Sequence, residues 1–188
     1  MRPARPREGS RALTDELTEE LAGIRYREAT EITAGTVANP RIRELYRYWL
    51  MKRGSAALPA KRDFDPLDHP QALGTLMILE QLDDGDYLYR LHGTKAAEQF
   101  GRDLTGHRLR EAAGPVVPFF IAKYDRCLEL GRPLYTVHRP VQMRTVALLE
   151  RLLMPFADSA GRPRFVVAFT APYALTGEVS EQTTSRMT

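Results

Sequence analysis

The sequence TLMILEQLDDGDYLYRLH, residues 75–92, reads as two strands joined by a tight turn. Residues 75–81 and 87–92 are both rich in the leucine, aromatic and β-branched side chains that favour strands. Between them, residues 83–86 read DDGD, a run typical of a chain reversal. Because so short a link joins only antiparallel neighbours, the stretch predicts a β-hairpin within an antiparallel sheet.

Three more strands are predicted towards the C-terminus. They span residues 134–141, 145–156 and 164–172, with tight links near 142–144 and at 158–161. Together with the hairpin they predict a five-stranded antiparallel sheet. The strand at 145–156 is rich in leucine and methionine on both of its faces, so each face of the sheet needs a cover.

Helices are predicted before and after the hairpin. Asn39 caps a helix that has Pro40 at its first position and ends at Gly54. Residues 94–100 predict a short helix, and residues 115–130 predict a long helix with one apolar stripe. This order of elements predicts an α+β domain, with helices on one face of the sheet and N-terminal helices outside it.

The N-terminal residues differ in composition. Residues 1–9 are rich in Arg and Pro and are expected to be disordered, whereas an amphipathic helix is predicted from Ser10. The apolar residues of that predicted helix are Leu13, Leu17, Leu21 and Ile24. We therefore divide the chain into a partly helical extension at 1–38, a domain at 39–175 and a flexible tail at 176–188.

Composition narrows the classes of function. The chain of 188 residues is 43% hydrophobic, but no apolar run is long enough to cross a membrane, and no secretory signal is recognised. Cys127 is the single cysteine, which favours a reducing cytoplasm over an oxidising compartment. The net charge is +3 and the arginines are scattered, so we do not expect a nucleic-acid partner.

The sequence DFDPLDHP, residues 63–70, has the residue types of a metal site but the pattern of a structural turn. Asp65 precedes Pro66 as a helix cap precedes a first-position proline, and Asp68 stands where a carboxylate favours the helix dipole. His69 is kept out of the helical region by the proline that follows it. We therefore predict a short capped turn without a metal ion, which would matter to function only as a hinge.

The sequence contains no recognisable catalytic pattern. Its histidines, which are His69, His92, His107 and His138, do not share the helical spacing of an HExxH site. A nucleophile elbow, a phosphate loop and zinc-ligand spacing are also absent from the sequence. We therefore predict a protein that is not an enzyme and acts by binding.

The segment HGTKAAEQFGRDLTG, residues 92–106, resembles PAS domains. It has a polar strand end, paired alanines on a short helix, an aromatic residue before glycine, and a Leu-x-Gly turn. Residues 41–173 resemble a bacterial subfamily of small single-domain PAS proteins, first described as a domain of unknown function. The segments that carry this resemblance, in order, are RELYRYWLMKRG, DFDP, YLYRLHGT, GRDLTG and ERLLMPFAD.

The resemblance implies a PAS-like sheet with a pocket between the long helix and the sheet, where a small ligand would lie. The candidate pocket residues are Phe120, Tyr124, Cys127, Tyr89, His92, His138, Arg139 and Glu150. Strand alternation leaves open whether His138 or Arg139 faces this pocket. Haem and flavin are not expected, because the long helix has no histidine and no flavin-photosensor sequence surrounds Cys127. No cofactor is predicted beyond an unidentified small ligand.

The resemblance also implies dimerisation through an N-terminal helix. The candidate interface residues are Ile42, Leu45, Tyr46, Trp49 and Leu50. An equal alternative is that this helix covers the outer face of its own sheet. The predicted function is a sensory or regulatory module, a cytoplasmic homodimer that contacts a regulatory protein. The alternatives are a ligand-independent adaptor whose pocket is filled by its own side chains and, less favoured, a nucleic-acid-binding regulator.

Overall fold

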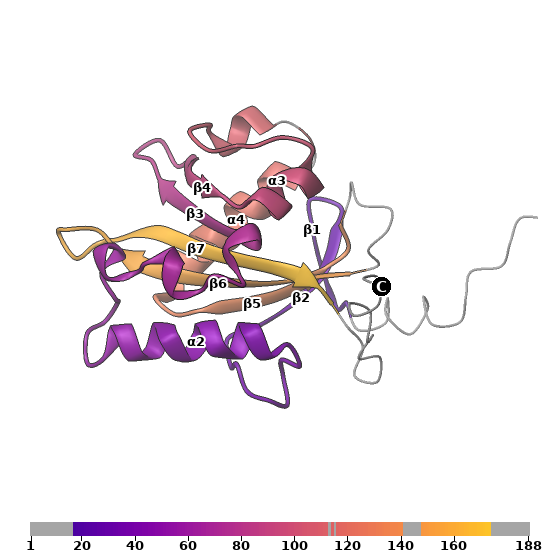
Figure 1. The fold of residues 1–188 in the computed structure, drawn as a ribbon. Coiled ribbons are helices and arrows are strands. Elements are labelled where there is room, and N and C mark those ends of the chain that lie inside the picture. The colour runs from indigo at the N-terminus through magenta and orange to yellow at the C-terminus, as the bar shows by residue number, and fades with distance from the viewer. Residues whose placement is uncertain (1–16, 113, 115, 141–147, 174–188) are drawn as a thin grey trace, which may run out of the picture.

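The computed structural model describes residues 17–112, 114, 116–140 and 148–173 of the chain (Figure 1). Within these residues, seven strands form one antiparallel sheet in the order β1-β2-β5-β6-β7-β3-β4. The strands are β1 (Glu19–Leu21), β2 (Ile24–Ala29), β3 (Leu76–Gln81), β4 (Tyr87–His92), β5 (Leu134–His138), β6 (Leu149–Ala157) and β7 (Pro163–Pro172). The α+β class predicted from the sequence is confirmed.

The predicted hairpin is formed by β3 and β4. Leu82 N donates a hydrogen bond to Asp86 O at 2.8 Å, and Gly85 takes a φ of 76°, which side chains other than glycine rarely adopt. β3 also pairs with β7, so the hairpin joins the three C-terminal strands in one sheet. All five strands expected from the sequence are present in the structure.

The N-terminal extension is not helical where the structure describes it. The predicted helix is wrong over residues 17–24, because β1 and β2 form a hairpin there, with positive φ angles at Ala22 and Gly23. β2 then pairs with β5 along the sheet edge. The backbone groups of that edge offer ladder hydrogen bonds, which outweigh a local helical spacing. The described sheet therefore has two more strands than predicted, and residues 10–16 lie outside the description.

The described residues contain three α-helices and several short 3₁₀ turns. They are α2 (Pro40–Arg53), α3 (Thr94–Phe100), α4 (Val116–Leu130), η1 (Lys61–Asp63), η2 (Pro66–Asp68), η3 (Leu73–Thr75) and η4 (Leu109–Ala112). α2 begins as predicted, since Asn39 Oδ1 accepts a hydrogen bond from Arg41 N at 3.0 Å. Among these residues, no helix has the length and apolar character needed to cross a membrane.

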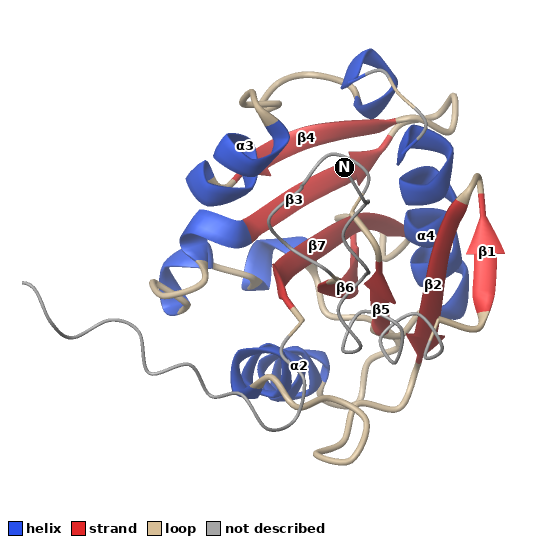
Figure 2. Ribbon diagram, turned by 90° about the vertical axis from the view of Figure 1, so that its right-hand side faces the viewer, coloured by secondary structure: helices blue, strands red, loops and turns tan. Residues whose placement is uncertain are grey.

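The sheet curves around α4, and α2 lies against its outer face (Figure 2). Alternation along β6 supplies both layers: Leu152 and Met154 belong to the core under α2, and Leu153 belongs to the core under α4. The expectation that both faces of this leucine-rich strand are covered is therefore confirmed. One cover comes from each helix of the same chain.

The apolar face of α2 is buried inside the subunit. Ile42, Leu45 and Trp49 are exposed by 1% or less, and Trp49 Nε1 donates to Pro155 O at 2.8 Å. These three side chains have no surface left for a second subunit, so their assignment to a dimer interface is wrong for this fold. Tyr46 and Leu50 are partly buried and pack against the same core. The structure favours the alternative that α2 covers its own sheet.

The DFDP turn is fastened to α2. Asp65 Oδ1 accepts from Leu67 N at 2.8 Å and caps η2, as predicted. Asp68 accepts a hydrogen bond from Tyr48 of α2 at 2.7 Å, and the ring of His69 lies edge-on to the Tyr48 ring at 4.4 Å. These contacts join the turn to the helix, which is consistent with a structural role for its carboxylates.

Candidate functional site

A cavity of about 100 Å³ lies between the sheet and the helices α3 and α4. Every strand from β2 to β7 contributes to its wall. Apolar side chains make most of the lining. The polar groups among them are few, which is typical of a small-molecule site in which each polar group fixes the orientation of a ligand.

The structure brings five of the eight predicted pocket residues to this cavity. Those five are Phe120, Tyr89, His92, His138 and Arg139. Tyr124 does not line the cavity itself, but its hydroxyl accepts a hydrogen bond from Arg151, which does. Cys127 is wholly buried in the core under α4, where burial raises the pKa of its thiol, and it does not line the cavity. Glu150 lies on the opposite face of the sheet, so its assignment to the pocket is wrong.

Arg151 of β6 lines the cavity, although the predicted pocket residues did not include it. Its side chain is buried with 4% exposure, and its Nη2 donates to the Tyr124 hydroxyl at 2.6 Å. The guanidinium carbon lies 4.3 Å from the centre of the Phe120 ring, a cation–π distance. Its Nε has no hydrogen-bond partner in the described part of the chain. No Asp or Glu is among the described residues that line the cavity.

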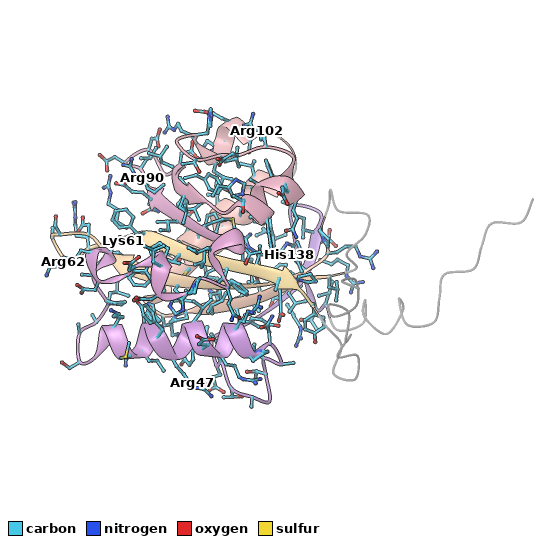
Figure 3. The ribbon with its side chains drawn as sticks, viewed as in Figure 1. Arg47, Lys61, Arg62, Arg90, Arg102 and His138 are labelled. Carbon is cyan, nitrogen blue, oxygen red and sulfur yellow. The ribbon has the colours of Figure 1, made fainter. Side chains whose placement is uncertain are left out.

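His138 is the last residue of β5 and lies opposite Leu149 of β6 (Figure 3 labels His138). Its ring is 5.2 Å from that of Phe119 and 6.1 Å from that of Phe120, and its Nδ1 has no partner among the described residues. Burial, assisted by the charge of Arg151, lowers the pKa of His138 to about 3. The imidazole is therefore neutral near neutral pH.

His92 joins the cavity to the turn that follows α3. Its Nδ1 accepts a hydrogen bond from Leu104 N at 3.0 Å, so the proton of the neutral ring is on Nε2. Burial lowers the pKa of His92, which favours this neutral form. The next residue must be glycine, because a Cβ on Gly93 would collide with the backbone of Leu73 and Gly74. Gly93 of the HGT sequence therefore lets the chain between β4 and α3 pass close to the backbone of Leu73 and Gly74.

Glu150 precedes Arg151 in the chain and points the other way. Its carboxylate is buried with 2% exposure, and it accepts hydrogen bonds from Asn39 Nδ2 at 2.6 Å and from the Tyr135 hydroxyl at 2.9 Å. Burial raises the pKa of Glu150, while these two donors oppose that shift. Asn39 is also the cap of α2. Glu150 therefore connects β6 directly to the start of the helix on the outer face.

Most of the chain matches the model of a known domain family. The family model of the PAS domain matches residues 37–169, which run from just before α2 to near the end of β7. The chain belongs to the PAS domain family. β1 and β2 precede the matched region, so they extend the PAS sheet at the β5 edge. Comparison with curated proteins and with solved structures gives no significant match.

PAS membership indicates a sensory or regulatory module of the kind that commonly mediates protein interactions. Within the described residues, no group of three His, Cys, Asp or Glu side chains is placed to hold a metal ion. The cavity polar groups are instead those of organic-ligand recognition: two guanidiniums (Arg139 and Arg151), two imidazoles (His92 and His138), the amide of Gln99 and the hydroxyl of Thr170. The alternation of β6 would have located Arg151, because Arg151 shares the α4 face with Leu153 and with His138 of β5.

Proposed function

We propose that this PAS domain is a regulatory module that binds a small ligand in the cavity and passes the signal to α2. The observation that carries the proposal is the pair of consecutive residues at the start of β6. Arg151 lines the cavity, and Glu150 holds the cap residue of α2 on the opposite face. A shift of the β6 backbone at one of these residues moves the other, because a single peptide bond separates them.

The output in this proposal is the outer surface of α2. Asn39 both caps the helix, through Oδ1, and donates to Glu150, through Nδ2. A ligand that binds one arrangement of β6 more tightly than another shifts the populations of the two, and with them the first turn of α2. Arg47 and Met51 are exposed on this helix (Figure 3 labels Arg47), where a regulatory protein or a second subunit would read the change.

The module would act by binding rather than by catalysis, in a reducing cytoplasm where Cys127 stays a thiol. The alternative of an adaptor with a self-filled pocket requires side chains to occupy the space beside Arg151. The cavity of about 100 Å³ weighs against it, because the described side chains leave that space beside Arg151 unfilled.

The proposal can be tested by filling the cavity with a larger side chain. Ala96 of α3 lines it, whereas its neighbour Ala97 does not, so Ala96→Leu and Ala97→Leu are a matched pair on one helix. Native mass spectrometry after mild purification should show a co-purified small molecule on the wild type and on Ala97→Leu, and a loss on Ala96→Leu. The rate of hydrogen exchange in the first turn of α2 should be the same in the wild type and Ala97→Leu, which carry the molecule, and different in Ala96→Leu, which does not. Equal behaviour of all three proteins would contradict the proposal.

A further inference from the structure

We infer that the ligand of the cavity is a small monocarboxylate, recognised by Arg151. The inference rests on the proposed function, since it names the chemistry of the ligand that the cavity would hold. It is carried by a charge that the described residues do not balance. A guanidinium stays protonated at all ordinary pH values, so Arg151 is a fixed positive charge in the interior.

The neighbours of Arg151 do not neutralise it. The Tyr124 hydroxyl accepts one hydrogen bond, and the Phe120 ring faces the guanidinium. The adjacent carboxylate, Glu150, is directed to the other side of the sheet and is engaged there by two donors. In the part of the chain that the structure describes, Arg151 forms no ion pair. A buried charge without a partner is costly, and an anion brought by a ligand removes that cost.

The free donors of Arg151 suit a carboxylate. A guanidinium has five N–H donors arranged as a planar fork; Nη2 of Arg151 donates to the Tyr124 hydroxyl, and Nε has no acceptor among the described residues. A carboxylate can accept two parallel hydrogen bonds from neighbouring donors of such a fork. The Phe120 ring lies against the guanidinium and supplies no oxygen acceptor. Both the donor geometry and the charge of Arg151 therefore favour a carboxylate.

The charge of the site favours one negative charge rather than two. Arg151 is the only buried arginine or lysine among the described residues that line the cavity, and His138 and His92 are held neutral by their surroundings. A phosphate or a dicarboxylate would bring a second charge with no buried cation to receive it. Arg139, which is exposed at the rim, attracts anions to the opening without taking part in the buried contact.

Volume and lining set the rest of the ligand. An apolar cavity of about 150 Å³ holds a benzene molecule, so the cavity here, at about 100 Å³, fits about four to six non-hydrogen atoms. Most of the other lining residues are apolar, and they include Met77, Ala96, Val116 and Leu149. A short acyl chain on a carboxylate, as in propionate or butyrate, suits one buried charge in a mostly apolar lining.

The experiment compares an acid with its neutral isostere. Binding of sodium butyrate and of butyramide to the full chain is measured by isothermal titration calorimetry at constant ionic strength. The expected result is an affinity for butyrate at least about tenfold higher than for butyramide, because hydrogen bonds to charged groups are the stronger ones. Arg151→Met should abolish this preference, whereas Arg139→Gln, at the rim, should keep it. Arg151→Lys keeps the charge without the fork and should bind butyrate more weakly than the wild type.

Each outcome separates the inference from the proposed function. Equal or tighter binding of butyramide would overturn the carboxylate assignment while leaving a ligand cavity. Tighter binding of methyl phosphate than of butyrate would do the same. If none of the straight-chain acids from acetate to hexanoate binds, the inference fails, whereas the proposed function fails only if native mass spectrometry also finds no co-purified molecule on the wild type. Unchanged binding of butyrate to Arg151→Met or to Arg151→Lys would overturn the role of the guanidinium.

Discussion

The two faces of β6 treat a buried charge in opposite ways. On the α2 face, Glu150 receives two hydrogen bonds, from Asn39 and Tyr135, within a closely packed core. On the α4 face, Arg151 has one hydroxyl acceptor, an unpartnered Nε and a cavity beside it. The two charges do not pair with each other, because consecutive strand residues point to opposite faces.

This difference distinguishes scaffold from site. A buried charge whose partners all come from the fold is a fixed structural part, and removing it damages the fold. A buried charge that lacks some of its hydrogen-bond partners within the fold can still bind a ligand of opposite charge. The closed face holds α2 in place, and the open face offers the ligand site. Substitutions on the two faces should therefore differ in their effects on stability.

The closed face should depend most on Trp49. Its ring is 1% exposed, and its Nε1 donates to Pro155 O of β6. Trp49→Ala should lower the free energy of unfolding by about 4 kcal/mol, measured by denaturant titration. The control is Arg47→Ala on the exposed side of the same helix, expected within about 0.5 kcal/mol of the wild type. A loss below about 2 kcal/mol would show that α2 does not anchor this face.

Glu150 should come next, and its two variants should differ. Glu150→Ala leaves two buried donors unpaired and should cost about 3 kcal/mol, whereas Glu150→Gln retains an acceptor for Asn39 and should cost under about 1 kcal/mol. Because the pKa of Glu150 is raised in the fold, its contribution to stability is present below the ordinary glutamate pKa and declines as the pH rises. Relative to Glu150→Gln, the wild type should therefore be less stable near neutral pH than in acid. Equal losses in both variants would argue against the hydrogen-bond network.

On the open face, His138 should make stability depend on pH. Its folded pKa is about 3, below the ordinary histidine value, so the unfolded chain binds a proton that the folded chain does not. Stability should be complete above the unfolded pKa and fall as the pH drops towards 3, by about 2 kcal/mol near pH 5. His138→Gln should remove this part of the pH dependence. Parallel stability curves for the two proteins would contradict the assignment.

The cap of the DFDP turn should have a smaller effect. Asp65→Ala removes the carboxylate that accepts from Leu67 N and should cost about 1 kcal/mol of unfolding free energy. The metal content of the protein, measured by mass spectrometry, should not change. The neighbouring substitution Leu67→Ala is the control, since Leu67 is 72% exposed and its loss should be near zero. A bound metal that leaves with Asp65 would assign chemistry to this turn.

The sequence predicted those elements whose local signals and tertiary contacts agree. Asn39-Pro40, Asp65-Pro66 and the DDGD turn identified their own structures, because each cap or turn uses side chains adjacent in sequence. The residues around Ile24 were predicted wrongly, since a sheet edge over a hundred residues away decides their conformation. The cavity residues on strands were partly found, but the sequence alone did not fix which of Glu150 and Arg151 faces it. That choice depends on which helix covers which face, and this is a property of the assembled core.

The smallest expected effect is the sharpest test of the comparison. Arg151→Met removes a buried charge as Glu150→Ala does, yet without ligand it should change the free energy of unfolding by less than about 1 kcal/mol, or raise it. The reason is that Met keeps the apolar contact with the Phe120 ring and ends the burial of an unbalanced charge, at the cost of one hydrogen bond to Tyr124. Denaturant titration in buffer free of carboxylates makes the measurement. If Arg151→Met is as damaging as Glu150→Ala, then Arg151 is part of the scaffold, and the two faces of β6 are alike after all.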